Sequence, residues 1–269
     1  MSGHPRAGSL RGRVALVTGG GRGIGRAIAL DLAAAGASVA VSARSGAEVA
    51  AVAAEIEASG GRGLALVADV TEPGSVAAMV AAATAELGPP LILVNNAGAA
   101  ASHKLLDHPD ALWDRMLDVN LTGPYRVTKA CAPAMLAAGW GRVITIGSVA
   151  SITGARYIAA YTAAKHGVLG LTRALAAEWA QQGITVNLVA PGYVDTALTD
   201  GSVANIVSRT GRSADEAREL LAAMSPQRRL IAPDEIAPLV TLLASDAAAS
   251  ITGAVLPIDA GASAIASTG

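Results

Sequence analysis

The 269-residue chain is short of several residue types that mark particular classes of protein. It has one cysteine, Cys131, so it cannot form an internal disulfide. Its first residues, "MSGHPRAGSLRGR", lack the apolar segment that a signal peptide needs. We therefore expect a cytoplasmic protein. The chain also contains no phenylalanine, an absence that carries no functional inference.

Charge is scarce and balanced. Charged residues make up 15% of the chain, and the formal net charge is −1. Without a broad positive field, the protein is not expected to bind nucleic acid or a membrane surface. No uncharged apolar run approaches the roughly 18 residues of a spanning helix. The four histidines form no cluster of the kind that holds a metal, so no metal is expected.

What the chain does have is apolar residues, which make up 52% of it. This fraction suffices for a large core and argues against disorder. No stretch in the middle has the composition of a linker. We therefore expect a single domain over residues 13–269, preceded by a flexible basic arm at residues 1–12.

Short β-branched runs alternate with helix-length stretches along the chain. Strands are expected at 14–18, 38–42, 64–68, 91–95, 142–146, 184–189 and 254–258, and helices at about 24–35, 47–59 and 73–87. Strands that are apolar on both faces and separated by helices predict a doubly wound, parallel α/β sheet of about seven strands with helices on both faces. Ligands bind such sheets beyond the carboxyl ends of the strands. Functional residues should therefore follow strands directly.

The stretch "TGGGRGIG", Thr18 to Gly25, follows the first strand and opens the first helix. Glycines in this position let the backbone turn sharply and approach a pyrophosphate, which backbone N–H groups at the helix N-terminus would bind. The alternative is a tight strand-to-helix connection without a ligand. At the end of the second strand stands "SARS" instead of an acidic residue. Arg44 and Arg22 could pair with a 2′-phosphate, which favours NADP(H) and leaves NAD(H) possible, unless both arginines are solvated surface residues.

Further polar groups follow the later strands: "NNAG" at 95–98, Ser148 in "GS", and "APG" at 190–192. In "YTAAK", Tyr161 and Lys165 would share one face of a helix. Taken singly, Ser148 and Asn120 could be helix caps and Tyr161 a structural residue. In this order and spacing, the glycine turn and these motifs resemble the short-chain dehydrogenase/reductase family over about Arg13 to Gly261.

The resemblance implies a Rossmann-like fold and an oxidoreductase that transfers a hydride between a nicotinamide and a ketone or secondary alcohol (CH–OH). Reducing a ketone also requires a proton, and a phenol stabilised as phenolate by a neighbouring ammonium can supply it. By resemblance, Tyr161 is the acid, Lys165 lowers its pKa and binds the nicotinamide ribose, Ser148 donates to the substrate oxygen, and Asn120 holds a water of the proton relay. The implied cofactor contacts are Thr18, Gly19, Arg22, Gly23, Ile24, Gly25, Arg44, Asp69, Val70, Asn95, Ala97, Gly98, Tyr161, Lys165, Pro191, Gly192, Val194 and Thr196.

Residues 193–227 have no strand of their own, and in this family such a segment covers the substrate. The pocket candidates Val149, Ala150, Ile152, Tyr157, Ile158 and Tyr193, beside Ser148 and Tyr161, are mostly apolar and favour a neutral ketone or the ketone end of an acyl group. The chain is similar to both 3-oxoacyl-thioester reductases and 3-hydroxybutyrate dehydrogenases. It lacks a polar grip for a carboxylate at Ala150 and Ile158, and docking arginines for a carrier protein at Gly139 and Gln182. A CoA-linked, polyketide-like or small ketone is therefore preferred.

Two alternatives stay open at this point. One is an NAD-linked 3-hydroxyacyl or secondary-alcohol dehydrogenase that works in the oxidative direction. The other is a non-catalytic dinucleotide sensor or scaffold, which would have no need of the proton donor Tyr161. The resemblance further implies a homotetramer, or a dimer, that pairs the helices over about 109–138 and 156–181.

Overall fold

A computed structural model describes residues 9–265 of the chain. Its centre is one sheet of seven strands in the order β3-β2-β1-β4-β5-β6-β7, with every neighbouring pair parallel. The predicted doubly wound α/β fold is confirmed. The order reverses at β1, which pairs with β2 on one side and with β4 on the other. This switch point is where such sheets bind their ligands.

The strands lie close to where the apolar runs predict them. Their bounds are β1 Val14–Thr18, β2 Ser38–Ala43, β3 Arg62–Val67, β4 Ile92–Asn95, β5 Gly141–Ile146, β6 Ile184–Pro191 and β7 Val255–Ile258. All residues of β1, β4, β5 and β6 are buried. Burial on both faces explains why these strands read as continuous apolar runs without alternation.

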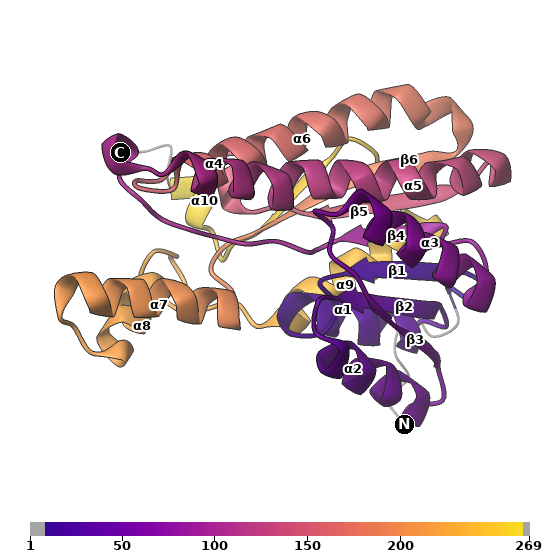
Figure 1. The fold of residues 1–269 in the computed structure, drawn as a ribbon, viewed down its shortest axis with the longest axis horizontal. Coiled ribbons are helices and arrows are strands. Elements are labelled where there is room, and N and C mark those ends of the chain that lie inside the picture. Colours follow the sequence, from indigo (N-terminus) through magenta and orange to yellow (C-terminus); the bar gives the residue numbers. More distant parts are fainter. Residues whose placement is uncertain (1–8, 266–269) are drawn as a thin grey trace.

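Helices cover both faces of the sheet (Figure 1). On one face lie α1 (Gly23–Ala34), α2 (Gly46–Ala58) and α9 (Pro233–Ala244), whose buried side chains include Ile28, Val52 and Val240. On the other lie α3 (Pro73–Leu87), α4 (Asp110–Leu117), α5 (Gly123–Ala138) and α6 (Ala159–Trp179). Each layer encloses its own core against the sheet, and these two cores hold the strands in place.

Two helices stand apart from these layers. The segment after β6 forms α7 (Ala197–Thr210) and α8 (Ala214–Ala222), which project to one side of the sheet in Figure 1. They pack on each other through a small cluster that contains Val203, Ala217 and Leu221. They occupy most of the segment 193–227 that the sequence marks as a cover for the substrate.

The described end of the expected N-terminal arm belongs to the packed fold. Leu10 is buried, and its backbone N–H donates to the Ala35 carbonyl at 3.0 Å. The backbone N–H of Arg13 in turn donates to the Leu10 carbonyl. Residues 9–12 are therefore a packed turn rather than an arm, and the rest of the expected arm, residues 1–8, lies outside the described residues.

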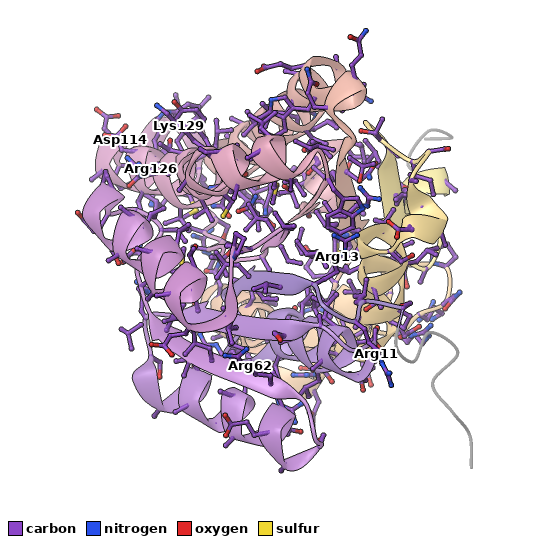
Figure 2. The ribbon with its side chains drawn as sticks, turned by 90° about the vertical axis from the view of Figure 1, so that its right-hand side faces the viewer. Arg11, Arg13, Arg62, Asp114, Arg126 and Lys129 are labelled. Carbon is purple, nitrogen blue, oxygen red and sulfur yellow. The ribbon has the colours of Figure 1, made fainter. Side chains whose placement is uncertain are left out.

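Charged side chains are dispersed over the molecule. Figure 2 shows Asp114, Arg126 and Lys129 on the α4–α5 layer and Arg62 well away from them, at the edge strand β3. Arg126 pairs with Asp118 at 2.6 Å, so part of this charge is neutralised locally. Within residues 9–265, no helix has the length and apolar character to cross a membrane.

Candidate active site

A large cleft of about 1550 Å³ opens at the carboxyl ends of the strands. The turn after β1 lines it, together with segments that follow β2, β3, β4, β5 and β6. The N-terminal part of α6 and the facing sides of α7 and α8 complete its wall. The topology thus gathers at one edge the polar groups that the sequence places after strands.

The turn after β1 is shaped by glycines that leave no room for a side chain. A Cβ at Gly25 would lie 2.2 Å from the Gly19 carbonyl oxygen, and one at Gly19 would lie 2.8 Å from the Ala97 Cα. Gly19 and Gly23 also have positive φ angles, of 62° and 54°. Asn96 fixes this turn by donating from its Nδ2 to the carbonyls of Thr18 and Gly19 at 3.0 and 2.9 Å. The result is a bare backbone cradle at the N-terminus of α1.

Tyr161 and Lys165 lie one turn apart on α6 and both line the cleft. The Lys165 side chain is buried, with 6% exposure, and its Nζ donates to the Ile146 carbonyl oxygen at the end of β5 at 3.0 Å. The same Nζ lies 5.7 Å from the centre of the Tyr161 ring. The two side chains therefore share the cleft face of the helix, as the four-residue spacing predicts.

Ser148 follows β5 and caps a short 3₁₀ helix, Val149–Ser151. Its Oγ accepts from the Ala150 backbone N–H at 3.1 Å. The Ser148 side chain also lies close enough to the Tyr161 hydroxyl to lower the pKa of that phenol. Ser148 is therefore both a cap, as the structural alternative holds, and a partner of the phenol in the cleft.

Asn120 lies in a π-helical turn, Asp118–Thr122, between α4 and α5. Its Nδ2 donates to the carbonyls of Ala99 and Met116 at 2.9 and 3.0 Å, and its Oδ1 accepts from the Ala99 N–H at 3.2 Å. A Cβ at Gly98 would lie 3.1 Å from Asn120 Oδ1 and 4.0 Å from Lys165 Nζ. Asn120 thus holds the strand-following loop against the helix, and a Cβ at position 98 would crowd the Asn120 Oδ1.

Burial dominates the protonation behaviour of the pair on α6. It lowers the pKa of Lys165 to about 8. Burial also raises the pKa of Tyr161, more than the Ser148 hydrogen bond lowers it, and the neighbouring Tyr193 adds to the rise. The resemblance implies that Lys165 together with the oxidised nicotinamide lowers the phenol pKa. In the protein alone, desolvation of the phenolate outweighs the effect of Ser148, and the pKa of Tyr161 is raised.

Several charged side chains line the cleft near the glycine turn and the ends of β2 and β3. Arg22, Arg44 and Asp69 line it, as does Glu48 from the first turn of α2. Burial raises the pKa of Asp69, but hydrogen bonds from Thr71 and the charges of Arg44 and Arg115 hold it below its usual value overall. Arg44 therefore lies close enough to this carboxylate to act on it electrostatically.

Most predicted cofactor contacts line the cleft. They are Gly19, Arg22, Gly23, Ile24, Gly25, Arg44, Asp69, Val70, Ala97, Gly98, Tyr161, Lys165, Pro191, Gly192, Val194 and Thr196. Thr18 and Asn95 do not line it, because their side chains are buried beneath its floor. Thr18 Oγ1 accepts the backbone N–H groups of Asn96 and Ala97 at 3.1 Å each, and Asn95 Nδ2 donates to Thr128. These two residues position the lining instead of forming it.

Of the predicted substrate contacts, Ser148, Val149, Ala150, Ile158, Tyr161 and Tyr193 line the cleft. Ile152 and Tyr157 do not, since both lie on an exposed loop before α6. The sequence missed Leu221 and Met224, which reach the cleft from α8 and just beyond it. Only the amphipathic pattern of "SADEARELLAAM" pointed to that contact. Asn96 was also missed, although it stands within the "NNAG" motif.

A second tyrosine and lysine share the same spacing elsewhere. Tyr125 and Lys129 lie on α5, with Lys129 Nζ 3.4 Å from the Tyr125 hydroxyl and 5.7 Å from the ring centre. Tyr125 is 45% exposed, and neither residue lines the cleft. Spacing alone therefore does not distinguish a pair in the cleft from a pair on the surface.

Comparison with known proteins places this cleft in context. The family model described as short chain dehydrogenase matches residues 13–207. The 3-oxoacyl-[acyl-carrier-protein] reductase FabG of Pseudomonas aeruginosa is 44% identical over 94% of this chain and 98% of its own length. The D-beta-hydroxybutyrate dehydrogenase of Rhizobium meliloti is 36% identical over 93% of this chain and 98% of its own length. Similarity thus extends over nearly the whole of each relative.

A solved structure also matches this chain over nearly its whole length. The crystal structure of an actinorhodin polyketide ketoreductase with NADPH superimposes with a TM-score of 0.91. It is 36% identical in sequence, and the match covers 96% of this chain and 99% of that one. The arrangement of the sheet and the two helical layers is therefore shared with a protein whose structure was solved with NADPH.

Proposed function

We propose a reaction for this protein from the premise that the chain belongs to the short-chain dehydrogenase family, and so is an oxidoreductase that acts on CH–OH groups and their ketones with a nicotinamide cofactor. The proposed direction is reduction of a ketone with NADPH. One observation carries this proposal. Tyr161, Ser148 and Lys165 meet in the same cleft as the glycine turn.

The backbone cradle at Gly19, Gly23 and Gly25 fits a pyrophosphate, because a Cβ at Gly25 would meet the Gly19 carbonyl at 2.2 Å. Arg22 and Arg44 fit a 2′-phosphate. Asp69 and Val70 would line the adenine, Ala97 and Gly98 the adenosine side, and Pro191 to Thr196 the carboxamide. When bound there, NADPH supplies the hydride for the carbonyl carbon.

The chain's own residues handle the proton. Tyr161 would donate its hydroxyl proton to the carbonyl oxygen, and Ser148 would donate a hydrogen bond to the same oxygen. Lys165, whose pKa is about 8, would hold the nicotinamide ribose and return a proton to Tyr161 through a water held near Asn120. The raised pKa of Tyr161 keeps the phenol protonated, which suits a group that acts as an acid.

The substrate end of the cleft supports a neutral ketone. Ala150, Ile158, Leu221 and Met224 line it, and none of them offers a charge to grip a free carboxylate. Arg229 also lines the cleft, but its guanidinium is held by Glu235 at 2.6 and 2.8 Å. A CoA-linked, polyketide-like or small ketone fits this lining. The names of the FabG and ketoreductase relatives agree with an oxoacyl or polyketide substrate class. A cytoplasmic location remains part of this proposal.

Replacing the phenol tests the reaction. Tyr161→Phe removes the proton donor and leaves the glycine turn and its arginines intact. We expect NADPH-dependent turnover of a model diketone to fall by at least about a hundredfold, which is the usual contribution of a positioned acid. NADPH binding, followed by its fluorescence, should change by less than about threefold.

Tyr125→Phe is the matched control, because it removes the same atom from the surface tyrosine–lysine pair on α5. Its turnover should equal that of the wild type. Turnover that survives in Tyr161→Phe would refute the assignment. Faster turnover of secondary alcohols with NAD than of ketones with NADPH would instead establish the oxidative alternative.

A further inference from the structure

A carboxylate lies where the structure also gathers the cations for a 2′-phosphate. Glu48 Oε1 is 3.3 Å from Arg22 Nη1, across 26 residues of sequence. Arg22 belongs to the glycine turn, and Glu48 to the first turn of α2 after β2. Both side chains line the cleft. The pair therefore lies inside the proposed dinucleotide site.

The Glu48 side chain is placed there by local structure. The Ser45 Oγ caps α2 by accepting the Glu48 backbone N–H at 3.3 Å, which leaves the Glu48 carboxylate free to reach Arg22. The positive end of the helix favours a negative charge in this turn. Gly21 makes room for it, because a Cβ there would lie 2.8 Å from the Glu48 Cβ and 3.2 Å from its Oε2.

The two cofactors differ at this point alone. NAD carries a 2′-hydroxyl on its adenosine ribose, and in many dinucleotide sites a carboxylate accepts a hydrogen bond from it. NADP carries a 2′-phosphate there instead, which arginines bind. A phosphate that pairs with Arg22 would compete with Glu48 for the guanidinium and lie close to the negative charge of Glu48. A ribose hydroxyl does not compete in this way. The Glu48 carboxylate thus disfavours binding of NADP and does not disfavour binding of NAD.

We propose that Glu48 is a specificity-determining residue, which weakens NADP(H) binding by competing with the 2′-phosphate for Arg22. This inference rests on the proposed dinucleotide site. It makes the preference for NADP(H) over NAD(H) modest, because Arg44 attracts the phosphate while Arg22 is held by Glu48. It also predicts that removing one negative charge makes the protein more selective.

Glu48→Gln tests this inference with little change of shape. We expect the Kd of NADPH to fall about fivefold and the Kd of NADH to change by less than about twofold, both from fluorescence titration at low salt. The gain for NADPH should shrink at about 0.5 M salt, because these side chains are exposed to solvent. Unchanged NADH binding also shows that the variant is folded. Glu48→Ala should give the same selectivity change.

Glu55→Gln is the matched control. It removes a carboxylate of the same helix that pairs with Arg26 at 2.6 Å outside the cleft. An unchanged or weaker affinity of Glu48→Gln for NADPH would overturn the inference, since Glu48 would then merely orient Arg22. A wild-type protein that binds both dinucleotides but reduces no ketone would contradict the proposed reaction instead, and leave the Kd comparison valid.

Discussion

At the scale of single residues, the structure explains why motifs located the site but not all of its chemistry. Ser148 could be found from sequence because it directly follows a strand, and Tyr161 and Lys165 because their spacing, together with the other motifs, resembles the family. Glu48 could not, since its partner Arg22 is 26 residues away in another element. The direction of the Tyr161 pKa shift also required the structure, because burial is a property of the packed cleft.

Lys165 is the residue whose burial has the clearest effect on stability. Its pKa in the folded protein is about 8, against 10.5 for the free side chain. Between these two values the unfolded chain binds the proton more tightly, so folding is opposed. This loss of free energy of unfolding is fully present below pH 8 and disappears as pH rises toward 10.5.

Comparing wild type with Lys165→Met isolates this effect. The free energy of unfolding of the wild type, relative to the variant, should rise by ~2 kcal/mol between pH 8 and pH 10. Urea unfolding at both pH values measures it. Lys129→Met, which changes an exposed lysine, should show no such change with pH. A difference between wild type and Lys165→Met that stays constant with pH would contradict the prediction.

At the scale of elements, regular strands and helices were predictable and irregular ones were not. Runs such as "VALVT" and "LILVN" gave the bounds of β1 and β4 to within a residue, because burial on both faces leaves a continuous apolar signal. The π-helical turn over Asp118–Thr122, which presents Asn120, leaves no such signal. Nor did the sequence separate α7 from α8.

The side chain of Arg218 ties these two helices to the segment that follows β6. Arg218 on α8 contacts Asp195, which lines the cleft, and donates to Asp200 on α7 at 2.8 Å. Asn205 of α7 also donates to the Ser102 hydroxyl in the loop after β4. The helices α7 and α8 are therefore held both to the segment after β6 and to the loop after β4.

Arg218→Met should loosen the attachment of α7 and α8. We expect thermolysin to cleave the segment 193–227 about two- to fivefold faster than in the wild type, because local opening becomes easier. Mass spectrometry of the early fragments identifies the segment. Arg212→Met removes an exposed arginine nearby and should leave the rate unchanged. Equal cleavage in all three proteins would show that the ion pairs do not restrain α7 and α8.

At the scale of the whole molecule, composition predicted a folded chain with a large core, whereas assembly depends on surfaces that composition does not describe. The apolar content indicated a large core, and the structure divides that core between the two faces of the sheet. Trp113, Tyr125 and Leu136 remain 37%, 45% and 42% exposed on α4 and α5. Such side chains on neighbouring helices favour contact with another subunit.

We predict a homotetramer that pairs the helices α4, α5 and α6, as the resemblance to the family implies. Light scattering coupled to gel filtration should give four times the 26.6 kDa mass of the chain. A dimer would restrict the pairing to one of these surfaces. A mass near that of one chain would show that the exposed side chains of α4 and α5 have no partner in solution.

The central place of β1 has a consequence for how the protein matures. β1 carries the glycine turn and is synthesised first, yet it becomes an interior strand only when β2 and β4 have docked on its two edges. Tyr161 and Lys165 emerge later still, on α6. If NADPH binds as proposed, recovery of its fluorescence after dilution from denaturant would therefore report docking of the strands on β1, and a nascent chain that ends before α6 would lack the proposed proton donor.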